Sequence, residues 1–192
     1  MHKGFATIEE TEKHLARFSF RESKLRQTPW FHTPAIGIGT SHSQGADPFG
    51  DSELFQRAVE YALKNGINFI DTALNYRGMK SEREIGRVLN AMVESDKTIE
   101  RNSVIIATKA GIIPGDIEAN LPPAKYLQEV LVKNGVIQEK DVNFTGSHNR
   151  HVMAPGYYRF AINKSREHLG VETIDIHYIH NPEISPRSRE FL

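Results

Sequence analysis

Short apolar runs along this chain alternate with longer segments in which apolar residues recur at helical spacing. The short runs are typical of strands, and they occupy residues 35–40, 67–70, 104–108 and 174–179. The helical spacing lies between them, at residues 51–65, 81–92 and 154–169. Strands that alternate with helices over short connections predict an α/β fold with a parallel sheet and right-handed crossovers.

Local signals set the ends of these helices. Asp51 or Ser52 can cap the first helix, and Gly66 is placed to end it. The sequence Ser81-Glu-Arg-Glu84 has the pattern of a capping box and predicts the start of the second helix. Gly170 is placed to end the last one.

Residues 1–33 do not follow the alternating pattern, because they are polar and mixed in character. They are interpreted as an N-terminal extension, with a short helix possible at residues 7–16. Phe18 and Phe20 alternate with polar residues, which predicts a short strand there.

The pattern breaks a second time between Lys109 and Pro155. Here the sequence predicts a helix from the Pro122-Pro123 pair to Leu131, and irregular structure at residues 136–149. A connection of this length within a compact domain is usually functional or flexible. An insertion at about 112–153, over the face where the strands end, is therefore expected.

Composition narrows the kind of protein. The 192 residues suffice for one domain with a buried core, and Lys+Arg 24 balance Asp+Glu 24, so neither nucleic acid nor an anionic membrane is the expected partner. Cysteine is absent, which excludes disulfides, thiolate metal sites and a cysteine nucleophile. No signal peptide or apolar span of about 20 residues is visible, so a cytoplasmic protein is expected.

Candidate chemistry lies where the strands end. Asp71, Lys109 and His180 each sit at the end of a predicted strand, and Tyr76 lies in the loop after one. Parallel α/β folds bind ligands beyond the carboxyl ends of their strands. A phenol can donate its proton, a lysine ammonium stabilises the phenolate left behind, a carboxylate holds the lysine, and an imidazole can orient a substrate oxygen.

Each of these residues alone has a plainer interpretation: a turn aspartate, a packing tyrosine, a solvated lysine and a core histidine. Their coincidence on successive strand ends favours a site that protonates a developing alkoxide, with hydride from a cofactor. His148 and His151 lack the further ligands of a metal site, so no metal is expected. The short Gly37-x-Gly39 lacks the remaining features of a dinucleotide-binding fingerprint.

The same residues stand in motifs that resemble those of the aldo-keto reductase family, over roughly residues 34–183. The motifs are Gly37-Ile-Gly39-Thr40, Asp71-Thr-Ala-x-x-Tyr76 followed by Ser81-Glu82 and Gly86, Ala107-Thr-Lys109, and Ile174-Asp-Ile-His-Tyr-Ile-His180-Asn-Pro182. The resemblance implies a (β/α) barrel of TIM type that uses NADPH, without a metal, to reduce aldehydes and ketones.

By this resemblance Tyr76 is the general acid, Asp71 and Lys109 are its tuning pair, and His180 orients a small carbonyl substrate. Gly39, Thr40 and Asp71 are expected to bind the NADP cofactor. Arg77 departs from the family pattern, which usually has glycine directly after the tyrosine.

The length of the chain is its largest departure from the family pattern, because a complete barrel needs about 250 residues. Residues 34–192 hold only about the first four βα units, the N-terminal half of such a barrel. The chain could be a fragment, could pair with another barrel half or with itself, or could be a truncated, non-catalytic remnant or binding subunit. Substrate identity and oligomeric state are not specified by the sequence.

Overall fold

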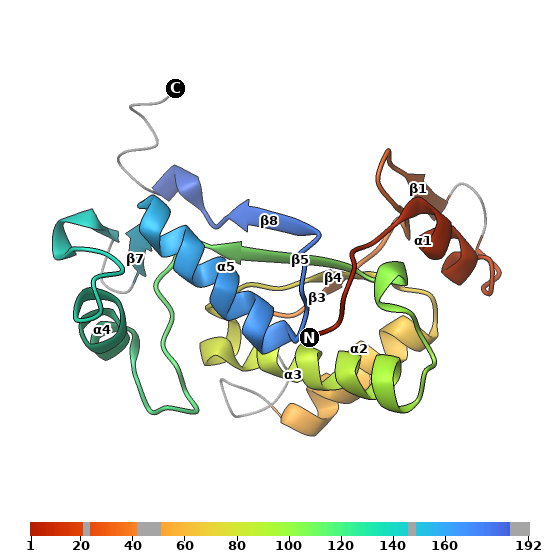
Figure 1. Ribbon diagram of the computed structural model, residues 1–192, viewed down its shortest axis with the longest axis horizontal. Helices are drawn as coiled ribbons and strands as arrows, with labels where there is room; N and C mark the ends of the chain where they lie inside the picture. The colour runs from red at the N-terminus through yellow and green to blue at the C-terminus, as the bar shows by residue number, and fades with distance from the viewer. Residues whose placement is uncertain (21–23, 42–50, 146–148, 185–192) are drawn as a thin grey trace.

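The computed structural model describes residues 1–20, 24–41, 51–145 and 149–184. A parallel sheet of four strands forms the centre, in the order β3-β4-β5-β8 (Figure 1). The strands are β3 (Ile38–Gly39), β4 (Phe69–Asp71), β5 (Ile105–Ala110) and β8 (Ile176–Ile179). The register sets Gly39 beside Asp71 and Asp71 beside Ala107. The prediction of a parallel α/β sheet is confirmed.

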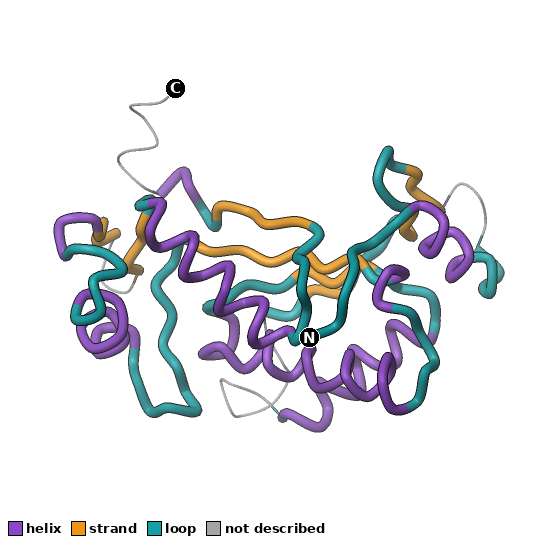
Figure 2. The backbone as a smooth tube through the Cα atoms, viewed as in Figure 1, coloured by secondary structure: helices purple, strands orange, loops and turns teal. Residues whose placement is uncertain are grey.

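Three helices lie along one side of this sheet, as Figure 2 shows. They are α2 (Ser52–Lys64), α3 (Lys80–Asn90) and α5 (Pro155–Leu169). The Oδ1 atom of Asp51 accepts hydrogen bonds from the first turn of α2, at 2.8 and 3.0 Å. Gly170 ends α5 in the left-handed conformation, with φ of 67°. Both predicted helix boundaries are confirmed.

Side-chain alternation along the strands decides which face each residue covers. Ile70 and Ile106, which are paired in the register, belong to the large apolar cluster that packs against α2 and α3. Ile105 points to the opposite face, where it clusters with Phe31 and the partly buried Phe69. The core of the chain therefore lies mainly between the sheet and its helices.

Helices α3 and α5 pack closely against each other at Gly86 of α3. A Cβ atom at this position would lie 2.2 Å from the backbone oxygen of His168 in α5. Only glycine fits there, because no side chain tolerates such a distance to a backbone atom. This contact sets how closely α3 and α5 cross.

The start of α3 differs from the sequence prediction. The helix begins at Lys80, and its N-cap residue Met79 has a left-handed backbone. The Ser81 hydroxyl donates to the Thr40 carbonyl at 2.8 Å, and Glu84 pairs with Arg77. The predicted capping box is wrong, because both of its side chains are committed to tertiary contacts instead.

The first part of the chain lies at the amino ends of the strands (Figure 1). It contains α1 (Ile8–Leu15) and an antiparallel pair, β1 (Leu25–Gln27) with β2 (His32–Pro34). The predicted helix is confirmed, but the strand expected at Phe18–Phe20 is wrong. Both rings instead approach Gly66, where a Cβ atom would lie 2.7 Å from each of them. Their alternation thus reflects packing and not a strand.

The segment between β5 and α5 lies at the opposite end, where β5 and β8 point (Figure 1). A short helix, α4 (Pro123–Tyr126), continues as a wider helical segment, Leu127–Val132. An antiparallel hairpin of β6 (Val142–Thr145) and β7 (Asn149–Val152) follows. The predicted helix is confirmed, whereas the irregular structure expected at 136–149 is wrong for residues 142–145 and 149, which lie in the strands of this hairpin.

Several expectations lie outside the described residues. These are the loop at 42–50, the chain after residue 184, and His148 of the histidine pair.

Candidate active site

Four side chains converge beyond the carboxyl ends of neighbouring strands. Asp71 is the last residue of β4, Lys109 is the last but one of β5, and His180 follows β8 directly. Tyr76 begins a 3-10 turn a few residues after β4. The parallel register of β4, β5 and β8 carries these residues to the same edge of the sheet.

Lys109 is the centre of the group. Its Nζ atom donates to Asp71 Oδ2 at 2.8 Å, to the Thr72 carbonyl at 2.7 Å and to the Tyr76 hydroxyl at 3.2 Å. An ammonium has three hydrogens and no acceptor, so these contacts use its full capacity. The lysine side chain is 15% exposed and the aspartate 37%, so the pair is open to solvent mainly on the carboxylate side.

The hydrogen bond between Lys109 and Tyr76 has a defined direction. Because the ammonium can only donate, the phenol oxygen must accept, and its own hydrogen is left for another acceptor. The Nζ atom also lies 4.7 Å from the centre of the tyrosine ring. The hydrogen-bond geometry therefore leaves the phenolic hydrogen of Tyr76 available to an acceptor other than Lys109.

His180 faces the tyrosine. The two rings meet edge to face, with 5.6 Å between their centres. Burial lowers the pKa of His180 from its ordinary value, and the charge of Lys109 lowers it further. The imidazole is therefore held in its neutral form, in which one nitrogen donates and the other accepts. Its Nδ1 atom is buried and has no hydrogen-bond partner among the described residues.

Gly39, Thr40 and Asp71, the residues expected to bind a cofactor, are adjacent but differ in accessibility. Gly39 is exposed, and a Cβ atom there would meet nothing within 4 Å. Thr40 is buried, and its hydroxyl donates to the Asp71 carbonyl at 2.9 Å. Gly39 and Asp71 can thus contact a ligand directly, whereas Thr40 holds the strand end in place.

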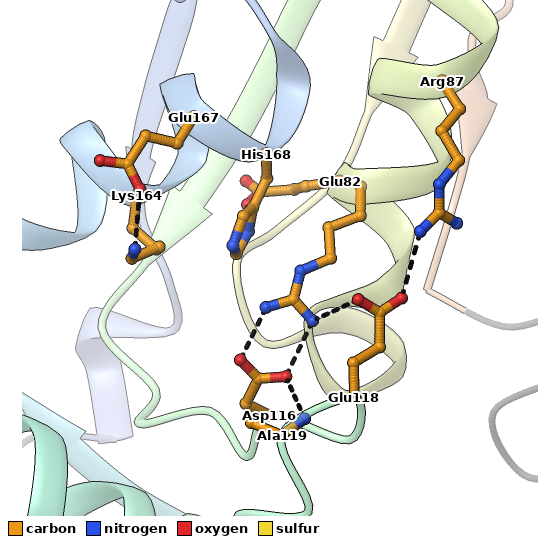
Figure 3. A network of polar contacts seen from close by, with 9 residues as sticks. Glu82, Arg87, Asp116, Glu118, Ala119, Lys164, Glu167 and His168 are labelled. Atoms are coloured by element: carbon orange, nitrogen blue, oxygen red, sulfur yellow. Dashed lines mark hydrogen bonds and ion pairs between the residues drawn. The ribbon is translucent and has the colours of Figure 1, made fainter.

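A polar network supports the site from the helix side. Glu82 is fully buried, accepts a hydrogen bond of 2.6 Å from Thr108, and lies 3.4 Å from the ring of His168. Figure 3 shows Glu82 and His168 together with ion pairs that join α3 to the loop after β5. In that loop Asp116 binds Arg83 at 2.6 and 2.8 Å, which lowers the pKa of the aspartate.

Two contributors were not expected from the sequence. The Thr72 carbonyl takes one of the three hydrogens of Lys109, and its position directly after Asp71 could have suggested this. His151 of β7 contacts the backbone of His180, and no local signal points to it.

Within the described ranges, no three His, Asp or Glu side chains gather as a metal site would require. In the same part of the chain, every helix is too short or too polar to span a bilayer.

Comparisons with known protein families, sequences and structures agree on one family. The model of the aldo/keto reductase family matches residues 35–190. A D-threo-aldose 1-dehydrogenase from Pseudomonas sp. is 27% identical over 152 residues, which cover 78% of this chain and 40% of that protein. The chain therefore spans less than half the length of this relative.

A solved structure shares the fold. An aldo-keto reductase from Bacillus halodurans, in its holo form, superposes with a TM-score of 0.50 and 23% identity. The match covers 80% of this chain and 39% of the other. It confirms the expected fold class, because the sheet and helices are those of a partial (β/α) barrel.

Proposed function

Because the chain belongs to the aldo/keto reductase family, we propose that it carries the proton-transfer site of an oxidoreductase that interconverts a small aldehyde or ketone with its alcohol. The observation that supports this best is the contact of the Lys109 ammonium with both Asp71 and the Tyr76 hydroxyl. Tyr76 is the proposed general acid.

In this proposal each side chain has one task. The phenolic hydrogen of Tyr76 passes to the carbonyl oxygen of the substrate as that oxygen gains negative charge. Lys109 stabilises the phenolate that remains, and Asp71 keeps Lys109 in position. The neutral His180 donates a hydrogen bond to the same substrate oxygen and orients it. In the oxidative direction the phenolate removes the proton of the alcohol.

A nicotinamide cofactor, when bound, supplies or accepts the hydride. The open backbone at Gly39 and the exposed side of Asp71 support contact with one end of such a molecule at the strand ends. NADP is the proposed form, by the family resemblance of the motifs.

Tyr76→Phe tests the assignment, because it removes the phenolic hydroxyl and keeps the aromatic ring. Aldehyde-dependent oxidation of NADPH should fall by at least about a hundredfold, which is the usual contribution of a general acid. Tyr61→Phe is the matched control, since Tyr61 is 72% exposed on α2. Turnover that survives in the Tyr76 variant would exclude Tyr76 as the acid.

A second candidate function is a non-catalytic one, in which the chain keeps the side chains but binds no cofactor. This chain corresponds to 40% of the length of its dehydrogenase relative, so cofactor binding by this chain itself is the property to measure. Titration with NADPH, followed by tryptophan fluorescence or calorimetry, separates the two. Saturable binding supports the reductase, and no binding at millimolar NADPH supports the alternative.

The open edge of β8 suggests a macromolecular partner. No strand within the described residues pairs with its outer side, and Tyr178 and Ile179 there are 44% and 48% exposed. An apolar cavity of about 780 Å³, lined in part by Trp30, continues along this edge. We propose that a strand of a second copy of this chain pairs here. Sedimentation of the wild-type chain should show association that Ile179→Lys abolishes.

A further inference from the structure

His151 lies on β7 of the inserted hairpin and is completely buried. Its Nε2 atom is 2.7 Å from the backbone oxygen of His180, a residue 29 positions further along the chain. A carbonyl oxygen can only accept, so Nε2 carries the hydrogen in this contact. The hairpin therefore delivers one buried donor to the residue that faces Tyr76.

The hairpin is fixed to the end of β5 by backbone hydrogen bonds. The Val152 N–H donates to the Gly111 carbonyl, and the Ile113 N–H donates to the Arg150 carbonyl, both at 2.8 Å. These bonds lie on either side of His151 and leave its ring little freedom to move.

Gly111 makes the contact sterically possible. A Cβ atom at this position would lie 2.8 Å from His151 Nε2 and 2.8 Å from the His180 oxygen. Its φ of 145° also lies in the region that favours glycine. A side chain at residue 111 would therefore push the imidazole donor and the carbonyl acceptor apart.

His180 itself is held by two backbone bonds. Its N–H donates to the Ala110 carbonyl at 2.7 Å, and its carbonyl accepts from His151. The next residue, Asn181, has a left-handed backbone with φ of 48°. The chain thus turns sharply after His180, and the bond from His151 fixes the peptide at the start of this turn.

We propose that His151 is a positioning residue, which holds the backbone of His180 so that the His180 ring stays edge-on to Tyr76. The inserted hairpin then has a task in the site, although no atom of His151 needs to touch the substrate. An effect of His151 on turnover rests on the proposed function, whereas its hold on the backbone of His180 does not.

Two substitutions at residue 151 separate the hydrogen bond from packing. His151→Gln keeps an N–H donor at a similar reach, and His151→Met fills similar space without a donor. Amide hydrogen exchange of His180 should be roughly fivefold faster in the Met variant, as expected for the loss of one net hydrogen bond. The Gln variant should exchange at nearly the wild-type rate.

NMR of the His180 ring gives a second readout. The charged or titratable groups around this ring are Lys109, Asp71, Glu183, His151 and Tyr76. Burial, Lys109 and His151 lower the pKa of His180. Loosening the peptide admits water to the ring and weakens the effect of burial, so the pKa of His180 should rise further towards 6.5 in the Met variant than in the Gln variant. The ring signals should also lose the shift caused by the tyrosine.

The methyl signals of Leu63 and Leu89, in the distant cluster under the sheet, monitor the global fold. If the Met variant does not fold, Gly111→Ala replaces it, because it disturbs the same contact from the other side. Wild-type exchange and ring signals of His180 in a folded Met or Ala variant would overturn the proposal. A Gln variant that behaves like the Met variant would also overturn it.

The activity assay separates this proposal from the proposed function. If the chain reduces an aldehyde, the Met variant should lower kcat more than it raises KM, and the Gln variant should restore kcat. A chain without reductase activity would refute the proposed function, and the NMR result would still decide the role of His151.

Discussion

The buried ion pair of Arg101 and Asp175 should be essential for stability. The two side chains are 3% and 4% exposed, and 2.8 Å separates Arg101 Nη2 from Asp175 Oδ2. The same carboxylate also accepts from the Ala6 N–H at 2.6 Å and from the Ile106 N–H at 2.8 Å. Asp175 thus ties the start of the chain and β5 to the segment that leads into β8.

Asp175→Asn tests this pair at nearly constant volume. The amide leaves the Arg101 charge buried without its counter-charge, and it turns an NH₂ group towards donors that need an acceptor. Breaking a buried pair in this way costs about 3–5 kcal/mol. With a urea dependence of roughly 2 kcal/mol per molar, the unfolding midpoint should fall by about 2 M.

Urea unfolding followed by circular dichroism measures this shift. Glu172→Gln is the matched control, because it removes the same charge from an exposed position nearby and should leave the midpoint almost unchanged. The double variant Asp175→Asn with Arg101→Met should lose less than the sum of the single losses, since no buried charge remains. Equal midpoints for Asp175→Asn and Glu172→Gln would refute the reasoning.

Three further substitutions test other contacts. Gly86→Ala should cost roughly 1–3 kcal/mol by overpacking α3 against α5, and calorimetry should show a thermal midpoint several degrees lower. Arg77→Gly should lower the free energy of unfolding in urea by about 2–4 kcal/mol, because the buried Glu84 carboxylate loses the arginine that pairs with it; a stable variant would contradict this. The ion pair lowers the pKa of Asp116, so its stabilisation should be fully present above pH 3.8 and should be lost as the pH falls through the lowered pKa. The difference in urea midpoint between wild type and Asp116→Asn should therefore shrink in acid.

The position of the candidate site could be predicted because it depends on local pattern. Strand ends follow from apolar periodicity, and parallel strands bring their carboxyl ends to one edge. The proximity of Asp71 and Lys109 is a consequence of these two rules, whereas Tyr76 reaches them from the turn after β4. The sequence could not specify the distances, nor that the Thr72 carbonyl completes the hydrogen bonds of the lysine.

Other parts of the fold depend on contacts between distant segments. Each strand of the hairpin of β6 and β7 has only four residues, a short signal in the sequence, and β7 is also held by backbone bonds to Gly111 and Ile113 outside the hairpin. The Phe18–Phe20 alternation predicted a strand, but the rings fill the space over Gly66. At Phe18 and Phe20, tertiary contacts overrode the local pattern.

Arg77 illustrates why a departure from a family motif cannot be judged at one position. Its backbone is left-handed, with φ of 51°, a conformation that costs a residue other than glycine roughly 1–2 kcal/mol. The guanidinium, however, pairs with the buried Glu84 seven residues later and lies 4.1 Å from the centre of the Phe55 ring. These two contacts come from α3 and α2, so the turn that presents Tyr76 is held by both helices. The contacts of the Arg77 side chain with Glu84 and Phe55 thus offset the cost of its left-handed backbone, which glycine would not incur. The sequence alone does not reveal these contacts, because they depend on the packing of α2 and α3.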